Sequence, residues 1–126
     1  MRLLLDTAVL ILALESPEQL SRRAAAYLHA PDNILELSAL SLSEMAIKAA
    51  RGKLRFSIGS VRQAIEDLDI RVLPFTAEHA YRLFDLPVHH KDPFDRQIIA
   101  QALCEGILVV TCDEIFRMYE GLKIVW

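Results

Sequence analysis

The sequence has few of the residues that stabilise small secreted proteins or form flexible linkers. Its two cysteines, Cys104 and Cys112, match no zinc-binding spacing, and a disulfide scaffold is excluded. A reducing, cytoplasmic environment is therefore expected. Four glycines and five prolines in 126 residues are too few for a low-complexity chain. This length predicts a single folded domain, residues 1–126.

Long apolar runs and an excess of positive charge are also absent. The longest apolar stretch, residues 3–14, is interrupted by Asp6 and is too short to span a bilayer. No clear signal-peptide cleavage pattern follows it, so we expect a soluble protein with no membrane partner. The net charge of −3 means that any nucleic-acid binding must come from a local basic patch.

Three widespread enzyme motifs are missing as well. The sequence contains no G-x-S-x-G, no P-loop and no G-x-G-x-x-G. These absences exclude the common serine hydrolases, nucleotide triphosphatases and dinucleotide-binding enzymes. The acidic residues are the remaining candidates for chemistry.

Short apolar segments alternate with helical patterns along the chain. Strands are expected at residues 2–6, 33–38, 69–75, 107–111 and 122–125. Helices are expected at residues 7–15, 18–29, 41–51, from 57 onward, 76–86, 92–106 and 113–119. This alternation predicts an α/β fold with a parallel sheet between helices. Such folds bind ligands beyond the carboxyl ends of their strands.

Carboxylates follow several of the predicted strands. Asp6 ends the first strand, Glu44 lies early in the helix after the second, and Asp113 follows the fourth. A right-handed crossover places the end of a strand and the start of the next helix on one rim, so these three acids should share it. The positions of Asp92 and Asp95 stay open, because their helix follows another helix rather than a strand.

Asp95 carries the sharpest signal among the acids. On a helix it shares a face with Ile98, Ile99 and Ala102. Burying an isolated carboxylate costs several kcal/mol, so Asp95 is expected to have a partner. The neighbouring Arg96 points about 100° away around the helix and is poorly placed for that role.

Convergence of the acids would require a cation or retained protons. The acids in question are Asp6, Glu44, Asp95 and Asp113. At ~6 Å and an effective dielectric constant of about 20, each pair repels by about 3 kcal/mol, and the total rivals the stability of a small domain. Carboxylate oxygens favour Mg²⁺ or Mn²⁺.

Most of these acids also have a purely structural interpretation. Asp6, Asp92 and Asp113 each precede a predicted helix and can act as its N-cap. The spacing Ser41-x-x-Glu44 fits a capping box. Capping does not explain the apolar face that Asp95 shares.

Basic residues and histidines flank the acids. The basic residues after Glu44 are Lys48, Arg51, Lys53 and Arg55. They can contact a phosphodiester backbone or form an ordinary solvated surface, and Lys48 can instead pair with Glu44. His89 and His90 are either metal or phosphate contacts or, as we favour, part of a solvated loop.

These segments together resemble a PIN domain, specifically the VapC-type toxins of type II toxin–antitoxin systems. The matching motifs are L-D-T at residues 5–7, S-E-M-A-I-K at 43–48, G-K-L at 52–54, H-H-K-D-P-F-D-R at 89–96, I-A-Q-A at 99–102 and V-T-C-D at 110–113. The resemblance covers residues 3–126, and D-P-F-D-R is its most specific part.

The resemblance implies a three-layer α/β/α sandwich with a central, mostly parallel five-stranded sheet. It also implies an Mg²⁺- or Mn²⁺-dependent endoribonuclease. The catalytic and metal-binding acids would be Asp6, Glu44, Asp95 and Asp113. Asp92 is a candidate additional acid and Thr111 a candidate supporting residue. Candidate contacts to RNA phosphates are Lys48, Arg51, Lys53 and Arg96.

The resemblance further implies a homodimer and a cognate antitoxin protein whose C-terminal segment lies across the active groove. Two positions depart from the family pattern, Ala8 where many relatives carry His and Ser43 where many carry Trp. Neither position is a metal ligand, so these departures bear on substrate details. Three alternatives stay open: a PIN-like binding module without nuclease activity, a nuclease acting on DNA, and a phosphatase.

Overall fold

The computed structural model describes residues 1–126 and shows strands and helices alternating along the chain. The five strands are β1 (Arg2–Leu5), β2 (Ile34–Ser38), β3 (Arg71–Leu73), β4 (Leu108–Val110) and β5 (Ile124–Val125). The six α-helices are α1 (Thr7–Glu15), α2 (Arg22–His29), α3 (Ala39–Ala50), α4 (Ile58–Asp67), α5 (Ala77–Arg82) and α6 (Pro93–Glu105). Three short 3₁₀ helices are η1 (Pro17–Gln19), η2 (Leu83–Asp85) and η3 (Glu114–Met118). None of these helices has both the length and the apolar composition needed to cross a bilayer.

The strands form one sheet in the order β3-β2-β1-β4-β5, and every neighbouring pair is parallel. The prediction of a parallel five-stranded sheet is confirmed. β1 is the central strand, where Leu5 is paired with Leu37 of β2 on one side and with Val110 of β4 on the other. From β1 the chain first adds β2 and β3 on one side and then adds β4 and β5 on the other side. The direction therefore reverses between β1 and β4, and such switch points are where α/β folds bind ligands.

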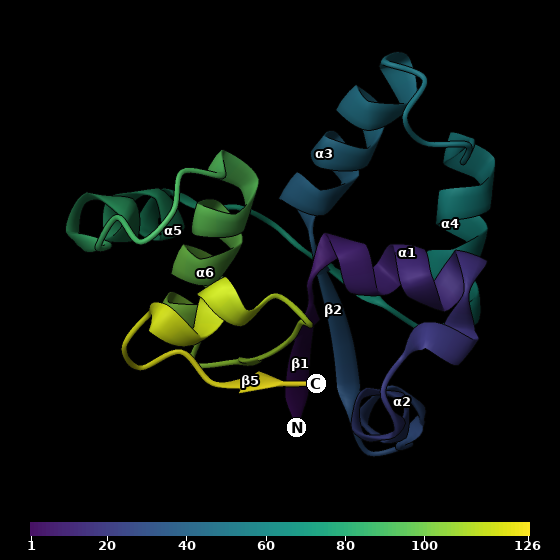
Figure 1. Ribbon diagram of the computed structural model, residues 1–126, viewed down its shortest axis with the longest axis horizontal. Coiled ribbons are helices and arrows are strands. Elements are labelled where there is room, and N and C mark those ends of the chain that lie inside the picture. Colours follow the sequence, from purple (N-terminus) through teal and green to yellow (C-terminus); the bar gives the residue numbers. More distant parts are fainter.

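Helices cover both faces of the sheet, which gives the three-layer α/β/α arrangement expected from the resemblance (Figure 1). Leu3 and Leu5 of β1 pack with residues of α1, α2, α3 and α4. Leu4 points to the opposite face and packs with residues of α6 and η3. All three leucines are fully buried, as expected for the central strand of a parallel sheet.

Two helix starts differ from the prediction, because serines cap the helices at other positions. The helix expected at residues 18–29 is divided into η1 and α2, since the Ser21 hydroxyl accepts a hydrogen bond from the Ala24 N–H and begins a new helix. α3 begins earlier than expected, because the Ser38 hydroxyl accepts from the Leu40 N–H. The predicted capping box that began at Ser41 is therefore wrong.

Further segments are shorter than expected. The strand predicted at residues 122–125 is β5 (Ile124–Val125), and the helix predicted at residues 113–119 is the 3₁₀ helix η3 (Glu114–Met118). β3 spans only Arg71–Leu73, preceded by Asp69, which adopts a left-handed conformation with φ of 51°. The helix expected at residues 76–86 is interrupted at Leu83, where α5 continues as η2. These differences shorten elements without changing their order.

Both ends of α6 match the prediction. The Asp92 carboxylate accepts a hydrogen bond from the Asp95 N–H, and Pro93 occupies the first helical position. Gly106 ends the helix in the left-handed conformation with φ of 65°. The helix that carries Asp95 is thus defined by local signals at both ends.

Replacing Gly106 by alanine is expected to lower the free energy of unfolding by about 1 kcal/mol, because a side chain disfavours the left-handed conformation. A Cβ atom at this position meets no other atom within 4 Å, so the loss would come from the backbone alone. Gly59→Ala in α4 is the control and should be neutral or stabilising, since a Cβ there lies 3.7 Å from the Ser57 Oγ. Urea denaturation measures both, and equal effects would contradict the described turn.

Candidate active site

Asp6 lies at the switch point of the sheet, directly after the central strand. Its backbone N–H donates to the Val110 carbonyl at 3.0 Å, which continues the pairing of β1 with β4. Its buried carboxylate accepts a hydrogen bond from the Thr111 hydroxyl at 2.8 Å. Although Asp6 occupies the N-cap position of α1, its side chain makes no capping hydrogen bond. The side-chain partner of the carboxylate therefore comes from the end of β4.

Glu44 is held on the same rim by a contact between the starts of α1 and α3. The buried Thr7 hydroxyl donates to the Ser41 hydroxyl at 2.8 Å. Glu44 lies three residues further along α3, on the same face as Ser41. It is buried, and its Oε2 lies 3.2 Å from the Lys48 ammonium. The i,i+4 pair considered from the sequence is thus present.

Asp113 and Asp92 are both helix caps, as their structural interpretation predicted. Asp113 accepts a hydrogen bond from the Ile115 N–H at the start of η3, and Asp92 accepts from the Asp95 N–H. Each cap uses one carboxylate oxygen, and both side chains are exposed. The Asp113 N–H donates to the Thr111 hydroxyl, the group that also donates to Asp6.

Asp95 in the first turn of α6 reaches the same region, which answers the question that the sequence left open. Burial and then the charges of Asp6, Asp92, Asp113 and Glu44, in that order, together raise the pKa of Asp95 to about 7. Four other carboxylates therefore lie close enough to act on the charge of Asp95.

Asp6 shows the same crowding of negative charge from its own side. The pKa of Asp6 is raised to about 6, chiefly by burial and further by the charges of Glu44 and Asp113. The hydrogen bond from Thr111 acts in the opposite direction and lowers that pKa. Desolvation and like charge together outweigh it, so the rim carries more negative charge than its hydrogen bonds compensate.

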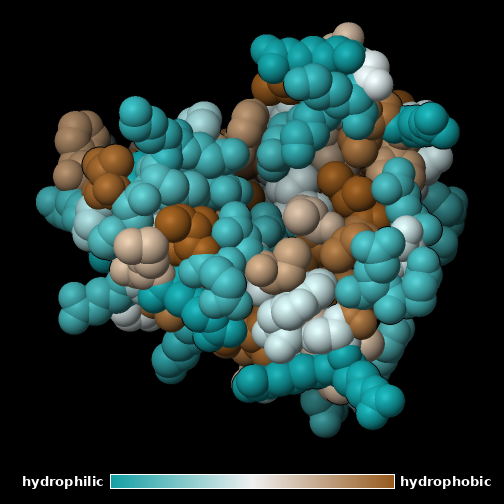
Figure 2. All heavy atoms as spheres, in the orientation of Figure 1, coloured by the Kyte–Doolittle hydropathy of each residue, from teal (hydrophilic) through white to brown (hydrophobic).

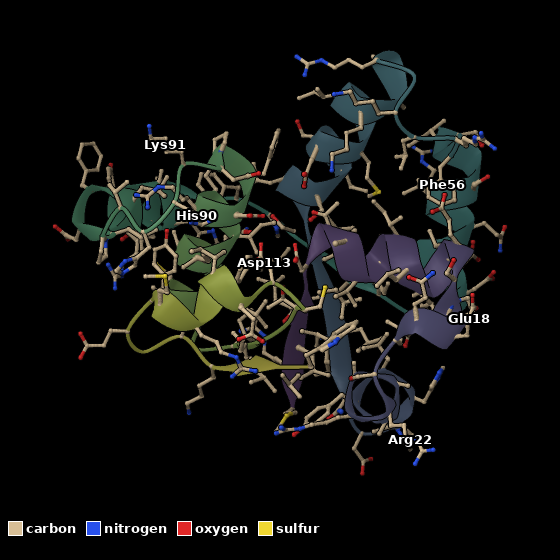
Figure 3. All side chains as sticks on the ribbon, viewed as in Figure 1. Glu18, Arg22, Phe56, His90, Lys91 and Asp113 are labelled. Atoms are coloured by element: carbon tan, nitrogen blue, oxygen red, sulfur yellow. The ribbon has the colours of Figure 1, made fainter.

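The partner that the sequence predicted for Asp95 is His90. The His90 Nε2 lies 3.2 Å from the Asp95 Oδ2, and its Nδ1 lies 2.7 Å from the Tyr119 hydroxyl. The interpretation of residues 88–91 as a simple solvated loop is therefore wrong for His90, which is half-buried. In Figure 3, His90 lies over α6 and Asp113 lies between α6 and α1. Tyr119 was missed from the sequence, because it is 29 residues from His90 and carries no local motif.

The candidate phosphate contacts fall into two groups. Arg96 donates hydrogen bonds to the carbonyls of Leu86 and Pro87 and to the Tyr119 hydroxyl, so its guanidinium is engaged within the protein. Arg51 and Lys53 at the end of α3 are exposed and form no ion pair. Together with Arg55, which is also exposed and without an ion pair, they are free to meet a ligand beyond the end of α3.

Comparison with known proteins decides the family. The family model described as PIN domain matches residues 3–122. The chain belongs to the PIN domain family. No curated protein sequence matches it significantly.

Solved structures similar to this PIN domain come from bacterial two-protein complexes. VapBC2 from Rickettsia felis, bound to a promoter DNA fragment, has a TM-score of 0.70 at 18% identity, covering 99% of this chain and 98% of that one. VapBC-1 from nontypeable Haemophilus influenzae has a TM-score of 0.70 at 19% identity, covering 99% and 97%. FitAcB from Neisseria gonorrhoeae has a TM-score of 0.67 at 21% identity, covering 98% and 96%. At these identities the likeness supports the fold.

PIN domains typically use divalent metal ions, and the donor set of this PIN domain fits such an ion by its chemistry. The candidate ligands are carboxylate oxygens, which suit Mg²⁺ and Mn²⁺. The raised pKa values of Asp6 and Asp95 show negative charge that a cation would compensate. No three His, Cys, Asp or Glu side chains lie close enough to hold an ion as they stand. Binding of a metal ion by three of these side chains therefore requires them to move toward one another.

Removing the charge of Asp95 is expected to stabilise the metal-free PIN domain at neutral pH. Its pKa of about 7 exceeds the ordinary 3.8, so the folded state binds a proton that the unfolded state loses as the pH rises through this window. The contribution of Asp95 to stability therefore falls between about pH 4 and pH 7. We expect the gain of Asp95→Asn over wild type to be about 1–2 kcal/mol larger at pH ~7.5 than at pH ~4, allowing for solvent screening.

Urea denaturation in EDTA at the two pH values measures this difference. Glu18→Gln is the matched control, because Glu18 is exposed on η1 and forms no ion pair. Its effect should be the same at both pH values. An equal gain from Asp95→Asn at both pH values would show that Asp95 is not under the repulsion described.

Proposed function

We propose that this PIN domain is a divalent-metal-dependent endoribonuclease that acts as the toxin of a type II toxin–antitoxin pair. The observation that carries the proposal is the convergence of carboxylates from four parts of the chain. They follow β1, lie on α3, open α6 and follow β4: Asp6, Glu44, Asp92 with Asp95, and Asp113. A structural cluster of this charge without a compensating cation is unfavourable, so a functional ion accounts for it best.

The four acids of the proposed metal site are Asp6, Glu44, Asp95 and Asp113. Bound Mg²⁺ or Mn²⁺ would supply an activated water and neutralise charge on the reacting phosphate. The Thr111 hydroxyl donates a hydrogen bond to the Asp6 carboxylate and accepts one from the Asp113 N–H. It therefore holds the ends of β1 and β4 in register. Asp92, which caps α6 and raises the pKa of Asp95, is the proposed additional acid.

RNA is the proposed substrate, with phosphates contacted from the end of α3. Lys48 lies beside Glu44, and Arg51 and Lys53 follow it on the exposed end of the helix. Basic side chains bordering a carboxylate site suit a phosphodiester backbone. Arg96 stays a predicted phosphate contact, but it would have to release its hydrogen bonds to act as one. These contacts do not distinguish RNA from DNA, so a DNA nuclease is the alternative.

An apolar pocket between α3 and α4 supports the proposed antitoxin partner. It has a volume of about 170 Å³ and is lined almost entirely by hydrophobic residues: Leu42, Met45, Ala46, Ala49, Leu54, Phe56, Ser57, Ile58 and Val61. Figure 2 shows hydrophobic side chains gathered on this part of the surface. The pocket is lined by α3 residues of a different helix face from Glu44, so a segment seated in it would dock on the helix that carries this acid. The VapBC complexes among the similar structures are consistent with a partner of this kind.

Three further expectations from the sequence stay predictions. They are the homodimer, the cytoplasmic location and the single domain spanning residues 1–126. Each follows from the resemblance or from composition.

Replacing Asp6 by asparagine is expected to lower the rate of RNA cleavage by at least about 100-fold, equivalent to about 3 kcal/mol in the barrier. The reason is that Asp6 is the most buried carboxylate of the rim and lies at the switch point. The measurement is cleavage of end-labelled RNA by purified protein with Mg²⁺, with Mn²⁺ and with EDTA. Glu18→Gln, at an exposed acid on η1, should cleave like wild type.

Substrate comparison distinguishes the alternatives. We expect cleavage of RNA and not of single-stranded DNA of the same sequence. Preferential cleavage of DNA would favour the DNA nuclease, and release of inorganic phosphate from phosphomonoesters would favour a phosphatase. Metal-independent binding of RNA without cleavage would favour the binding module.

Replacing Ile58 by aspartate is expected to weaken the complex with the proposed antitoxin at least about 10-fold, because a charge would enter the apolar pocket. Ile58 is 69% exposed, so the substitution should leave the fold intact. The candidate antitoxin is to be sought in the neighbouring genes, and the measurement is its Kd for this chain after the two are co-expressed and separated. Val88→Asp, at a residue 73% exposed outside the pocket, is the matched control. Equal affinities for both variants would exclude the pocket as the docking site.

A further inference from the structure

The loop that precedes α6 is held in place by the helix that follows it. Arg96 donates to the Pro87 carbonyl at 2.7 Å and to the Leu86 carbonyl at 3.2 Å. The same guanidinium donates to the Tyr119 hydroxyl at 3.1 Å. One side chain of α6 therefore ties together the start of the loop and the residue that follows η3.

Tyr119 is the centre of this arrangement and is almost completely buried, at 2% exposure. The His89 ring packs edge-on against it, with ring centroids 4.7 Å apart, and the His90 ring does so at 5.6 Å. Its ring belongs to the core cluster that includes Phe116. A phenylalanine would fill the same volume, so the buried hydroxyl needs its own explanation, since burying it unpaired is costly.

The chemistry of the groups sets the direction of the hydrogen bonds. A guanidinium can only donate, so the Tyr119 oxygen accepts from Arg96. The phenolic hydrogen then has one acceptor within reach, the His90 Nδ1 at 2.7 Å. With Nδ1 accepting, the neutral imidazole carries its hydrogen on Nε2, which lies 3.2 Å from the Asp95 Oδ2. The result is a continuous chain from Arg96 through Tyr119 and His90 to Asp95.

We propose that Tyr119 and His90 are positioning residues for the metal site. The Tyr119 hydroxyl sets the tautomer and orientation of His90, and the His90 Nε2–H holds one oxygen of Asp95 so that the other stays available to a metal ion. This inference rests on the proposed function, because it assigns Asp95 as a metal ligand. Hydrogen-bond partners of metal ligands commonly set metal affinity by orienting the ligand.

The sequence positions of these residues agree with such a role. His90 and Asp95 lie on opposite sides of the Asp92–Pro93 helix start, so the loop conformation alone would not fix their distance. Tyr119 comes from the segment after β4, the strand that also brings Thr111 to Asp6. The same segment of chain therefore supports both Asp6 and Asp95, each through one hydroxyl-mediated contact.

Tyr119→Phe is expected to weaken Mn²⁺ binding about 10-fold while the core packing stays the same. Isothermal titration of the full chain with MnCl₂ measures the Kd, and the thermal midpoint in EDTA measures stability. Tyr81→Phe is the matched control, because Tyr81 is 62% exposed on α5 and makes no side-chain hydrogen bond. A lowered thermal midpoint with an unchanged Kd for Mn²⁺ would show a merely structural hydroxyl and overturn the proposal.

A double-mutant cycle with His90→Gln tests whether Tyr119 acts on Asp95 through His90. The glutamine amide can donate to Asp95 without the phenolic hydrogen, so Tyr119→Phe should have no further effect on the Kd in that background. Additive effects of the two substitutions would overturn the relay. Long-range ¹H–¹⁵N spectra of the histidine side chains should show Nε2 protonated in wild type and a changed tautomer distribution in Tyr119→Phe. Unchanged imidazole shifts would also contradict the proposal.

The same titrations separate this inference from the proposed function. Wild-type binding of Mn²⁺ that is lost in Asp6→Asn supports the metal site, whatever Tyr119→Phe does. A wild-type protein that binds no Mn²⁺ would overturn the proposed function and this inference with it.

Discussion

Repulsion among carboxylates on one rim of a parallel sheet is the constraint around which the rest of the molecule is arranged. Asp6 ends the central strand, so it is buried by the sheet that forms around it. Glu44 arrives from α3 and Asp95 from α6, two helices that pack against one another. The packing of these elements brings the three negative charges into one region of the molecule. The charges are therefore a cost that the fold accepts at this position.

Each of the three buried or half-buried acids receives one donor from outside the group. Thr111 donates to Asp6, Lys48 pairs with Glu44, and the His90 ring meets Asp95. The donors come from β4, α3 and the loop before α6. Asp6 also accepts a hydrogen bond from the Thr7 backbone N–H, but donors still do not balance the negative charge of the rim, which is the state expected of ligands awaiting a shared cation. A fully compensated cluster would instead surround each acid with several donors.

Local sequence signals predicted the elements well, and contacts between distant segments explain most of what they missed. Asp92-Pro93 and Gly106 define α6 through capping and backbone preference, which need no knowledge of the fold. Ser41 fitted a capping box, but tertiary structure engages it with Thr7 and leaves the cap to Ser38. The acids at strand ends could be found because apolar runs mark the strands and because parallel strands end on the same rim of the sheet. The contact of His90 with Tyr119 could not, because no spacing relates two residues in separate loops.

The opposite rim shows that burial by itself does not make an acid functional. Glu36 in β2 is as buried as Asp6. Its two carboxylate oxygens, however, accept hydrogen bonds from the Arg2 guanidinium at 2.7 and 3.0 Å.

Glu105 lies at the other end of α6 from Asp95, so one helix carries an acid to each rim. Burial pulls the pKa of Glu105 up, but hydrogen bonds from His79 and Arg2 outweigh it and hold that pKa below its ordinary value. The pKa of Asp95 is raised instead, because its neighbours are other acids. Arg2 therefore compensates the structural carboxylates Glu36 and Glu105, whereas no arginine pairs with the acids at the switch point. That difference in partners, within one helix, is the strongest physical reason to place the chemistry at the rim of Asp6 and Asp95.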